Sequence, residues 1–161
     1  MKLKILLTGG TIDKSYNESN GELGFEESYI SEMLALGRNK TNTSIEQLMM
    51  KDSLEMTEAD RQLILKACEN SSEQKLLITH GTDTMVQTAQ MLGEAKLNKS
   101  VVLVGAMVPF VFKHSDALFN LGFALGALQT LPVGVYVAMN GSVFSWDNVV
   151  KNLALGEFQA L

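Results

Sequence analysis

The amino-acid sequence predicts an α/β fold, a three-layer sandwich with a mostly parallel, Rossmann/flavodoxin-like sheet. Short apolar runs alternate along the chain with segments whose apolar residues have helical spacing, which is the pattern of parallel β/α proteins. The short runs lack polar alternation, as expected for strands that are covered on both faces. The chain has 161 residues, of which 46% are hydrophobic and 19% are charged. We therefore expect a single domain over residues 1–161, with no C-terminal domain.

Short apolar runs define the expected strands. Leu3–Leu7 is predicted to be a buried first strand because its apolar run stops at the turn residues Thr8-Gly9-Gly10. Similar runs bounded by turn residues predict further strands at residues 45–50, 75–79, 101–104 and 133–138. Residues 13–25 are polar and contain two glycines, so they are expected to form a flexible loop, a candidate lid.

Helical spacing and capping residues define the expected helices. One of them begins at the N-cap Thr57, with Asp60 three residues later as a near capping box. Another begins at the N-cap Ser115-Asp116. Together, the expected helices cover residues 28–36, 57–68, 84–92 and 115–128, and a last helical stretch begins after Asp147.

Charge and cysteine content limit the partners and the compartment. Thirteen Lys and Arg residues against eighteen Asp and Glu residues give a net charge of -5, so no excess positive charge favours binding to nucleic acid or to an anionic membrane. Cys68 is the single cysteine, and it is expected to be an unreactive core residue. The N-terminal apolar run is shorter than the ~7–15 residues of a secretory signal, and no segment approaches the ~18 residues of a membrane span. We therefore expect a soluble, cytoplasmic protein.

Glycines and polar residues follow three of the predicted strands. They form the segments Thr8–Thr11, His80–Asp83 and Gly105–Met107. Ligands of open parallel sheets bind outside the carboxyl ends of the strands, so these segments mark the expected site. Neither a G-x-G-x-x-G nor a P-loop pattern occurs, which does not favour a nucleotide site. The glycines either form tight turns only or allow backbone N–H groups to approach a carboxylate or an oxyanion.

Thr11 presents a hydroxyl at this edge and is a candidate nucleophile. A threonine hydroxyl needs a partner that accepts its proton or stabilises its deprotonated form, and the candidates are Asp83, Lys151, Tyr16, His80 and His114. His80 is expected to make a structural hydrogen bond instead. His114, Ser115 and Asp116 are not expected to form a triad, because consecutive side chains do not converge. Two histidines without an acidic cluster predict no zinc site. Ser53, before the capped helix, is either an ordinary turn residue or a donor to a small anion.

Two motifs in order resemble a known family. Thr8–Ile12 (TGGTI) and His80–Met85 (HGTDTM), each directly after a predicted strand, are similar to the two signature motifs of the bacterial-type L-asparaginases, the threonine amidohydrolases. Further similar stretches are Asp52–Thr57, Val104–Pro109 with Ser115, Asp116 and Asn120, and Asn140-Gly141 with Lys151. The resemblance covers essentially the whole chain, but only the N-terminal domain of the family.

The resemblance implies a role for each matching residue. Thr11 would be the nucleophile that forms an acyl-enzyme with the side-chain carbonyl of asparagine, and a loop tyrosine, for which Tyr16 is the candidate, would partner it. Thr82 would position or activate the attacking water, and Lys151 would adjust its basicity. Recognition of the substrate would use Asp83 for the α-amino group, Ser53 for the α-carboxylate and the backbone carbonyl of Ala106 for the scissile amide. No metal and no organic cofactor is implied.

The sequence departs from the family pattern at two places. Leu54 stands where many members have a polar residue. The C-terminal domain of longer members supplies a carboxylate to the neighbouring site, and the expected substitutes here are Glu18, Glu22, Glu26 and Glu27. We predict an amidohydrolase that releases ammonia from L-asparagine or a related small amide, with a non-catalytic amino-acid-binding or regulatory module as the alternative. A homo-oligomer, most simply a C2 dimer, is expected.

Overall fold

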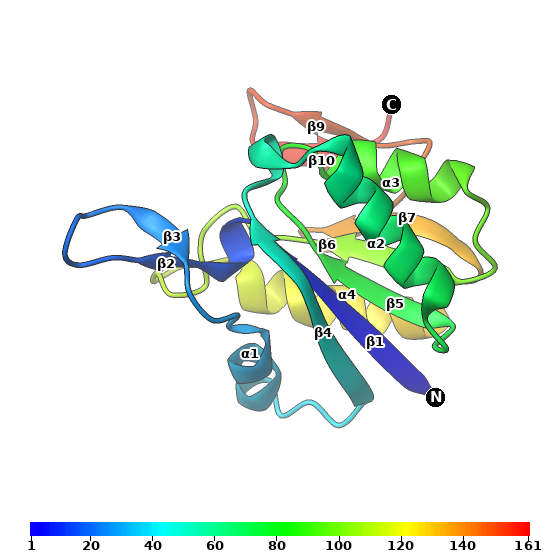
Figure 1. Ribbon diagram of the computed structural model, residues 1–161, viewed down its shortest axis with the longest axis horizontal. Coiled ribbons are helices and arrows are strands. Elements are labelled where there is room, and N and C mark those ends of the chain that lie inside the picture. The colour runs from blue at the N-terminus through cyan, green and yellow to red at the C-terminus, as the bar shows by residue number, and fades with distance from the viewer.

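A central six-stranded sheet organises the computed structural model, which describes residues 1–161 (Figure 1). The strands follow the spatial order β4-β1-β5-β6-β7-β8, in which all neighbours are parallel except β7 and β8. The parallel strands thus have the flavodoxin-like order, and the predicted α/β sandwich is confirmed. The strands of the sheet are β1 (Lys2–Gly9), β4 (Asn42–Lys51), β5 (Lys75–Thr79), β6 (Ser100–Val104), β7 (Gly134–Met139) and β8 (Ser142–Ser145).

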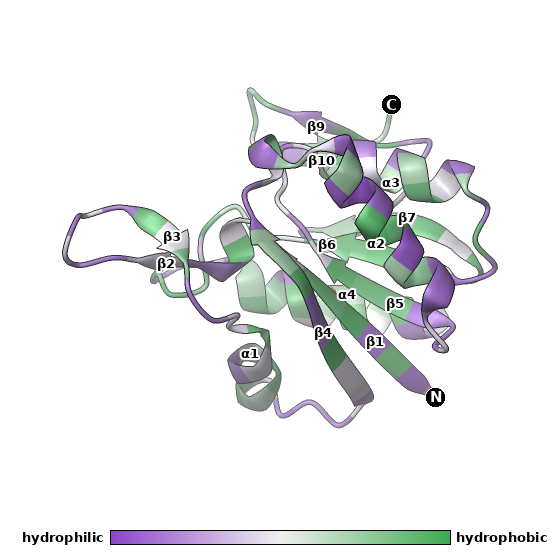
Figure 2. Cartoon of the chain, in the orientation of Figure 1, coloured by the Kyte–Doolittle hydropathy of each residue, from purple (hydrophilic) through white to green (hydrophobic).

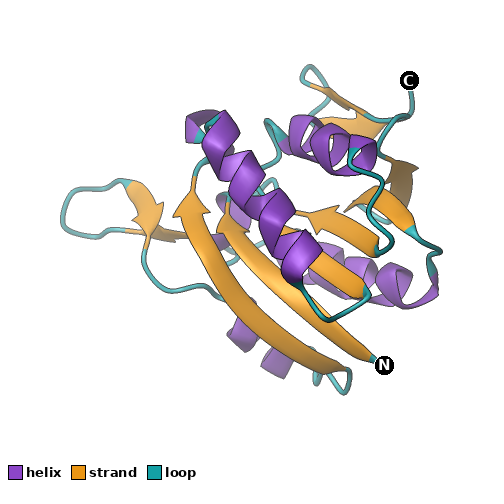
Figure 3. Cartoon of the chain, turned by 45° about the vertical axis from the view of Figure 1, so that its right-hand side comes forward, coloured by secondary structure: helices purple, strands orange, loops and turns teal.

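Helices cover both faces of the sheet. One layer contains α2 and α3, and the other contains α1 and α4 (Figures 1 and 3). Their bounds are α1 (Ile30–Leu36), α2 (Glu58–Asn70), α3 (Met85–Glu94) and α4 (Ala117–Thr130). The predicted capping box at the start of α2 is complete, because Thr57 and Asp60 each accept a hydrogen bond from the backbone N–H of the other. No helix combines the length and the apolar character needed to cross a membrane.

The core lies where the strands meet the inner faces of the helices. The central strands are hydrophobic along most of their length (Figure 2), and Leu77, Ile78 and Val102 are fully buried in them. Burying one such side chain contributes about 1.5–3 kcal/mol. Cys68 belongs to the same core, and its burial raises the pKa of the thiol to about 12. The predicted core position of Cys68 is therefore confirmed.

Residues 13–25 do not form the expected flexible loop. The strands β2 (Lys14–Tyr16) and β3 (Leu23–Phe25) pair as an antiparallel ribbon that projects from the body of the molecule (Figure 1). Its turn is closed by backbone hydrogen bonds from Asn17 to Glu22 and from Gly21 to Asn17, and Gly21 adopts a left-handed φ of 73°. The polar composition therefore marked a tight ribbon turn rather than an unstructured segment.

The C-terminal part of the chain also differs from the expectation. The helical stretch predicted after Asp147 is wrong, because β9 (Val150–Asn152) and β10 (Glu157–Gln159) form a second antiparallel ribbon there. The Asn152 side chain accepts hydrogen bonds from the backbone N–H groups of Ala154 and Leu155, and Gly156 has a φ of 65°. This Asx-type turn favours a hairpin over a helix in this segment.

Candidate functional site

The carboxyl ends of β1 and β5 define the place of the site. These strands are neighbours, with Leu7 paired to Thr79, yet the chain leaves β1 toward β4 on one side and leaves β5 toward β6 on the other. Such a reversal is the topological switch point at which open α/β sheets bind ligands. The segments Thr8–Thr11 and His80–Asp83 follow these two strands, so both motifs lie at the switch point.

Glycines let the loops at this edge touch one another. A Cβ on Gly10 would lie 2.3 Å from the backbone nitrogen of Gly81, and a Cβ on Gly81 would lie 2.6 Å from the Ser53 hydroxyl oxygen. Both distances are far below a normal van der Waals contact, so only glycine fits at either position. Thr11, Thr82 and Ser53 each lie in or directly beside one of these contacts, which gathers three hydroxyl groups around the switch point.

Lys151 reaches this edge from β9. Its ammonium group donates a 2.8 Å hydrogen bond to Thr82 Oγ1 and forms an ion pair with Asp83 Oδ1 at 2.7 Å. The Lys151 and Thr82 side chains are largely buried, whereas 42% of the Asp83 side chain is exposed. The threonine hydroxyl is thus held against a positive charge, while the Asp83 carboxylate keeps one face open to a ligand. No group of three or more His, Cys, Asp or Glu side chains lies together as a metal site would require.

Ser53 is fixed from two directions. Its hydroxyl oxygen accepts a hydrogen bond from the backbone N–H of Thr84 at 3.3 Å, and the Thr84 hydroxyl donates to the Ser53 carbonyl at 2.9 Å. Asp52, the residue before it, pairs with Lys14 of β2 at 2.5 Å. This hydrogen-bonded ion pair lowers the pKa of Asp52. The Ser53 turn is therefore tied to the loop after β5 and to the β2–β3 ribbon.

Asp116 and Asn120 hold the loop that contains Ala106, a role that the sequence did not reveal. The Asp116 carboxylate accepts hydrogen bonds from the backbone N–H groups of Met107 and Val108 at 3.0 Å each. The buried Asn120 amide donates to Asp116 at 2.8 Å and to the carbonyl of Gly105 at 3.0 Å. Asp116 occupies the predicted N-cap position of α4, but its side chain does not cap the helix. Together, Asp116 and Asn120 fix the backbone on both sides of Ala106, because Asp116 binds Met107 and Val108 and Asn120 binds Gly105.

Tyr16 lies apart from the Lys151 contacts. Tyr16 pairs with Leu23 on the projecting β2–β3 ribbon, and the tyrosine is 51% exposed. The Tyr16 hydroxyl lies 3.8 Å from the Cβ position of Gly21, so the ring extends along its own ribbon. The structure brings Thr82, Asp83 and Lys151 together but does not bring Tyr16 to them. The acidic residues expected to replace a missing carboxylate are exposed on this ribbon and just after it: Glu18, Glu22, Glu26 and Glu27.

Asp13 closes the base of the same ribbon. Its buried carboxylate accepts hydrogen bonds at 2.9 Å from the Ser28 hydroxyl and from the backbone N–H of Tyr29. Burial raises the pKa of this carboxyl group, and the two hydrogen bonds oppose that shift. Because Asp13 also lies in the 3-10 turn that begins at Thr11, the two ends of the ribbon are joined beside the candidate nucleophile.

His80 makes the structural hydrogen bonds that the sequence predicted. Its Nδ1 donates to the carbonyl of Gly81 at 2.8 Å, and its Nε2 accepts from the Thr88 hydroxyl at 2.8 Å. A carbonyl can only accept, which assigns the proton of the neutral ring to Nδ1. Complete burial lowers the pKa of His80 to about 4. The ring therefore stays neutral and braces the turn that precedes Thr82.

Acidification is expected to destabilise the fold through His80. Between about pH 6.5 and pH 4 the unfolded chain binds a proton at this residue and the native protein does not, so stability falls as the pH falls through this window. The free energy of unfolding should be lower at about pH 4.5 than at pH 7 by roughly 2–3 kcal/mol from this residue. Urea denaturation at both pH values measures the difference.

The matched control for this measurement is the exposed His114. Changing His114→Gln should leave the pH dependence unchanged, whereas His80→Gln should remove most of it. An equal acid destabilisation of the wild type and His80→Gln would contradict the assignment. Asp60 and Glu73 have pKa values lowered to about 2. The stability that these two carboxylates contribute is therefore lost mainly at a lower pH, as the pH falls toward about 2.

The fold and this edge together define a doubly wound α/β protein with hydroxyl, lysine and aspartate side chains at its switch point. A family model described as "Asparaginase, N-terminal" matches residues 2–159. The chain therefore belongs to the asparaginase family and corresponds to its N-terminal domain.

Individual relatives agree with this assignment. The chain is 34% identical to a "Probable L-asparaginase periplasmic" of Haemophilus influenzae, over 92% of this chain and 46% of that protein. Among solved structures, the thermostable L-asparaginase from Thermococcus kodakarensis has a TM-score of 0.87 at 30% identity, covering 100% of this chain and 51% of that one. A "Probable Cytoplasmic L-asparaginase" from Campylobacter jejuni has a TM-score of 0.85 at 31% identity, covering 99% and 52%. The chain spans about half the length of the curated relatives it matches.

Proposed function

We propose that this chain carries the amide-hydrolysing site of an L-asparaginase-like amidohydrolase. The observation that supports it most strongly is the Lys151 ammonium, which contacts both Thr82 and Asp83 beside the loop of Thr11. Relatives named L-asparaginase match the whole length of the chain. The expected substrate is L-asparagine or a related small amide. A cytoplasmic location stays a prediction, since the relatives are described as periplasmic in one case and cytoplasmic in another.

In the proposed first half-reaction, the Thr11 hydroxyl attacks the carbonyl carbon of the side-chain amide. The hydroxyl proton passes through a neighbouring acceptor to the departing nitrogen, the C–N bond breaks, and ammonia leaves. Backbone N–H groups beside Thr11 and Thr82 would stabilise the oxyanion; losing one donor of such a site costs about 10²–10³ in rate. The product of this step is an ester between Thr11 and the acyl group of the substrate.

In the proposed second half-reaction, water hydrolyses the ester. Thr82 would position or activate the water, and the Lys151 ammonium, which donates a 2.8 Å hydrogen bond to the Thr82 hydroxyl, would adjust the basicity of that hydroxyl. The proton lost by the water would pass to the departing Thr11 oxygen. The water adds to the ester carbonyl, the bond to Thr11 Oγ breaks, and the Thr11 hydroxyl regains its proton. The acid is released, and the site returns to its starting state.

Substrate recognition in this proposal uses groups that the fold already fixes. The exposed face of Asp83 would bind the α-ammonium, and the Ser53 turn would bind the α-carboxylate. The carbonyl of Ala106, held between the Asn120 and Asp116 hydrogen bonds, would accept from the scissile amide. Each charge of a small amino acid would thereby meet an opposite charge or a donor, and an unmatched buried charge would weaken binding strongly.

Tyr16 requires a movement in this proposal. It would partner Thr11 only if the β2–β3 ribbon folded back over the switch point, because Tyr16 now lies along the projecting ribbon. The hydrogen bonds from Ser28 and Tyr29 to Asp13 would then hold the base of the ribbon in place while the rest of the ribbon moves.

Ammonia release from L-asparagine by the purified chain tests the proposal. Thr11→Ala removes the attacking oxygen, so the rate should fall by about 10³-fold or more. Thr130→Ala, the same change at the exposed end of α4, should keep the wild-type rate. Heat of binding of L-asparagine and L-aspartate is measured in parallel. Binding without ammonia release from a panel of small amides would overturn the enzymatic proposal and support the amino-acid-binding alternative.

A further inference from the structure

An acidic side chain lies directly beside the turn that is proposed to hold the substrate α-carboxylate. Asp52 precedes the 3-10 turn Ser53–Glu55, and its Oδ1 accepts a 3.0 Å hydrogen bond from the backbone N–H of Leu54. The Asp52 carboxylate therefore lies against the same turn that contains the buried Ser53. Two negative charges at one turn repel each other, so a substrate carboxylate needs a cation there to compensate.

Cations nearby in the sequence do not compensate Asp52. Residues 52–58 contain three acidic side chains and no basic one. Lys51 is paired with Asp60 through hydrogen bonds of 2.8 and 2.9 Å. Arg61 is buried in α2 and donates to backbone carbonyls near the start of that helix. A partner for Asp52 must therefore come from another part of the chain.

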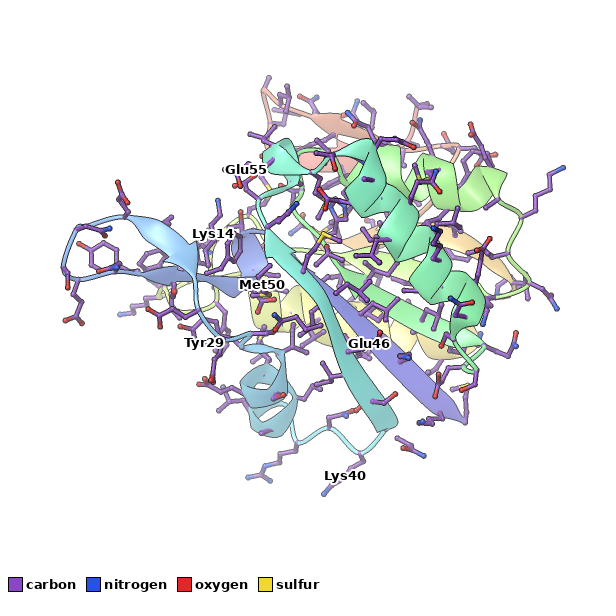
Figure 4. All side chains as sticks on the ribbon, in the orientation of Figure 1. Lys14, Tyr29, Lys40, Glu46, Met50 and Glu55 are labelled. Carbon is purple, nitrogen blue, oxygen red and sulfur yellow. The ribbon has the colours of Figure 1, made fainter.

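Lys14 provides this cation. It begins β2, at the base of the projecting ribbon and beside the end of β4 (Figure 4), and its Nζ lies 2.5 Å from Asp52 Oδ2. Only 19% of the Lys14 side chain and 29% of the Asp52 side chain are exposed, so salt and water screen this pair only in part. Both Asp52 oxygens are thus occupied, one by the Leu54 N–H and the other by Lys14. The turn offers its hydroxyl and N–H donors without an uncompensated charge from Asp52.

The same lysine joins this turn to the candidate nucleophile. Lys14 follows the 3-10 turn Thr11–Asp13, and its backbone N–H donates to the carbonyl of Thr11. Its side chain reaches the residue directly before Ser53. One residue therefore binds, through its backbone, the turn that would attack the amide and, through its side chain, the turn that would hold the carboxylate.

We propose that Lys14 is a positioning residue that enables the Ser53 turn to accept a carboxylate, because it neutralises Asp52. This role rests on the proposed function, in which that turn binds the α-carboxylate of the substrate. Without Lys14, Asp52 stays ionised at neutral pH, since the ordinary pKa of an aspartate is about 3.9. Even at a separation of roughly 10 Å, one unit charge near a protein surface changes the affinity for another by about 10-fold. Lys14 thereby favours amides that carry a carboxylate.

Titration calorimetry of L-aspartate with the purified full chain tests this role. Lys14→Met removes the cation and should weaken binding by about 10-fold. Asp52→Asn keeps an acceptor for the Leu54 N–H but removes the negative charge, so this variant should bind at least as tightly as the wild type. The double variant Lys14→Met/Asp52→Asn should recover most of the affinity, because neither charge remains. For L-asparagine, Lys14→Met should raise KM more than it lowers the saturating rate.

Lys4→Met is the matched control. It breaks an ion pair of similar length, 2.6 Å between Lys4 and Glu46, and Glu46 precedes Asp52 by roughly 20 Å of extended chain. This variant should bind L-aspartate like the wild type. Circular dichroism shows whether each variant is folded, and Asp52→Asn decides the outcome if Lys14→Met does not fold.

Full affinity in Lys14→Met would overturn the proposal. Weak binding that persists in the double variant would also overturn it, since the ion pair would then serve the structure rather than the charge. Weaker binding by Asp52→Asn, or no binding of L-aspartate by the wild type, would have the same consequence. The titrations require no turnover. The expected affinities without ammonia release would end the enzymatic proposal alone, whereas ammonia release with full affinity in Lys14→Met would end this one alone.

Discussion

Replacing Lys151 with methionine is expected to reduce ammonia release from L-asparagine by roughly 10²–10⁴-fold, the range for removal of a general acid–base group. Methionine keeps an unbranched side chain but cannot donate to Thr82 Oγ1 or pair with Asp83. The Thr82 hydroxyl would lose the positively charged neighbour that adjusts its basicity, so activation of the attacking water would be weaker. Steady-state rates, with the saturating rate and KM reported separately, measure the effect.

Lys40→Met is the matched control for this substitution. Lys40 lies in the loop before β4, at the opposite end of that strand from the Ser53 turn (Figure 4). Its replacement should change neither the rate nor KM. A Lys151→Met variant that releases ammonia at the wild-type rate would remove Lys151 from the proposed mechanism. Loss of binding with an unchanged saturating rate would assign Lys151 to substrate recognition instead.

Replacing Gly10 with alanine is expected to lower the free energy of unfolding by about 2–6 kcal/mol. Overpacking contributes about 1–3 kcal/mol of this loss, because the new Cβ would lie 2.3 Å from the backbone nitrogen of Gly81. Backbone strain contributes about 1–3 kcal/mol more, because Gly10 has φ 85° and ψ 175°, a region that essentially only glycine occupies. Urea denaturation at neutral pH measures the loss.

Gly24→Ala provides the comparison. Gly24 lies in β3 with no atom within 4 Å of its Cβ position, so this variant should be as stable as the wild type or slightly more stable. If Gly10→Ala were equally stable, the loops after β1 and β5 would not be packed as closely as the structure places them. A less stable Gly10→Ala protein should also lose ligand binding, because Thr11 and Thr82 lie next to this contact.

The parallel sheet was predictable because local and tertiary preferences agree there. Leu77 and Val102 lie in apolar runs that are buried on both faces, and the turn residues after those runs end the strands. The β7–β8 hairpin was missed, although Asn140-Gly141 is a strong hairpin signal and both residues have positive φ values. The Asn152 turn is a related case, because an asparagine side chain that binds the backbone two and three residues further on favours a turn over a helix.

The candidate site was predictable in its residue types but not in its contacts. Thr82 and Asp83 follow a strand directly, so their place at the sheet edge follows from the fold class. Lys151 lies 69 residues after Thr82, and nothing in local sequence preference brings the two together. Asp116 is recognisable as a helix N-cap position, but its hydrogen bonds to the loop of Ala106 depend on how α4 packs against β6.

The position of Lys151 in the β9–β10 ribbon has a consequence for biosynthesis. All the other groups of the candidate site leave the ribosome before Lys151 does, and the six-stranded sheet is complete in sequence by Ser145. The nascent chain can therefore form this sheet while Thr82 and Asp83 still lack their cationic partner. Competence for chemistry would arise only with the docking of the last ribbon, so a folded but immature chain would remain inert.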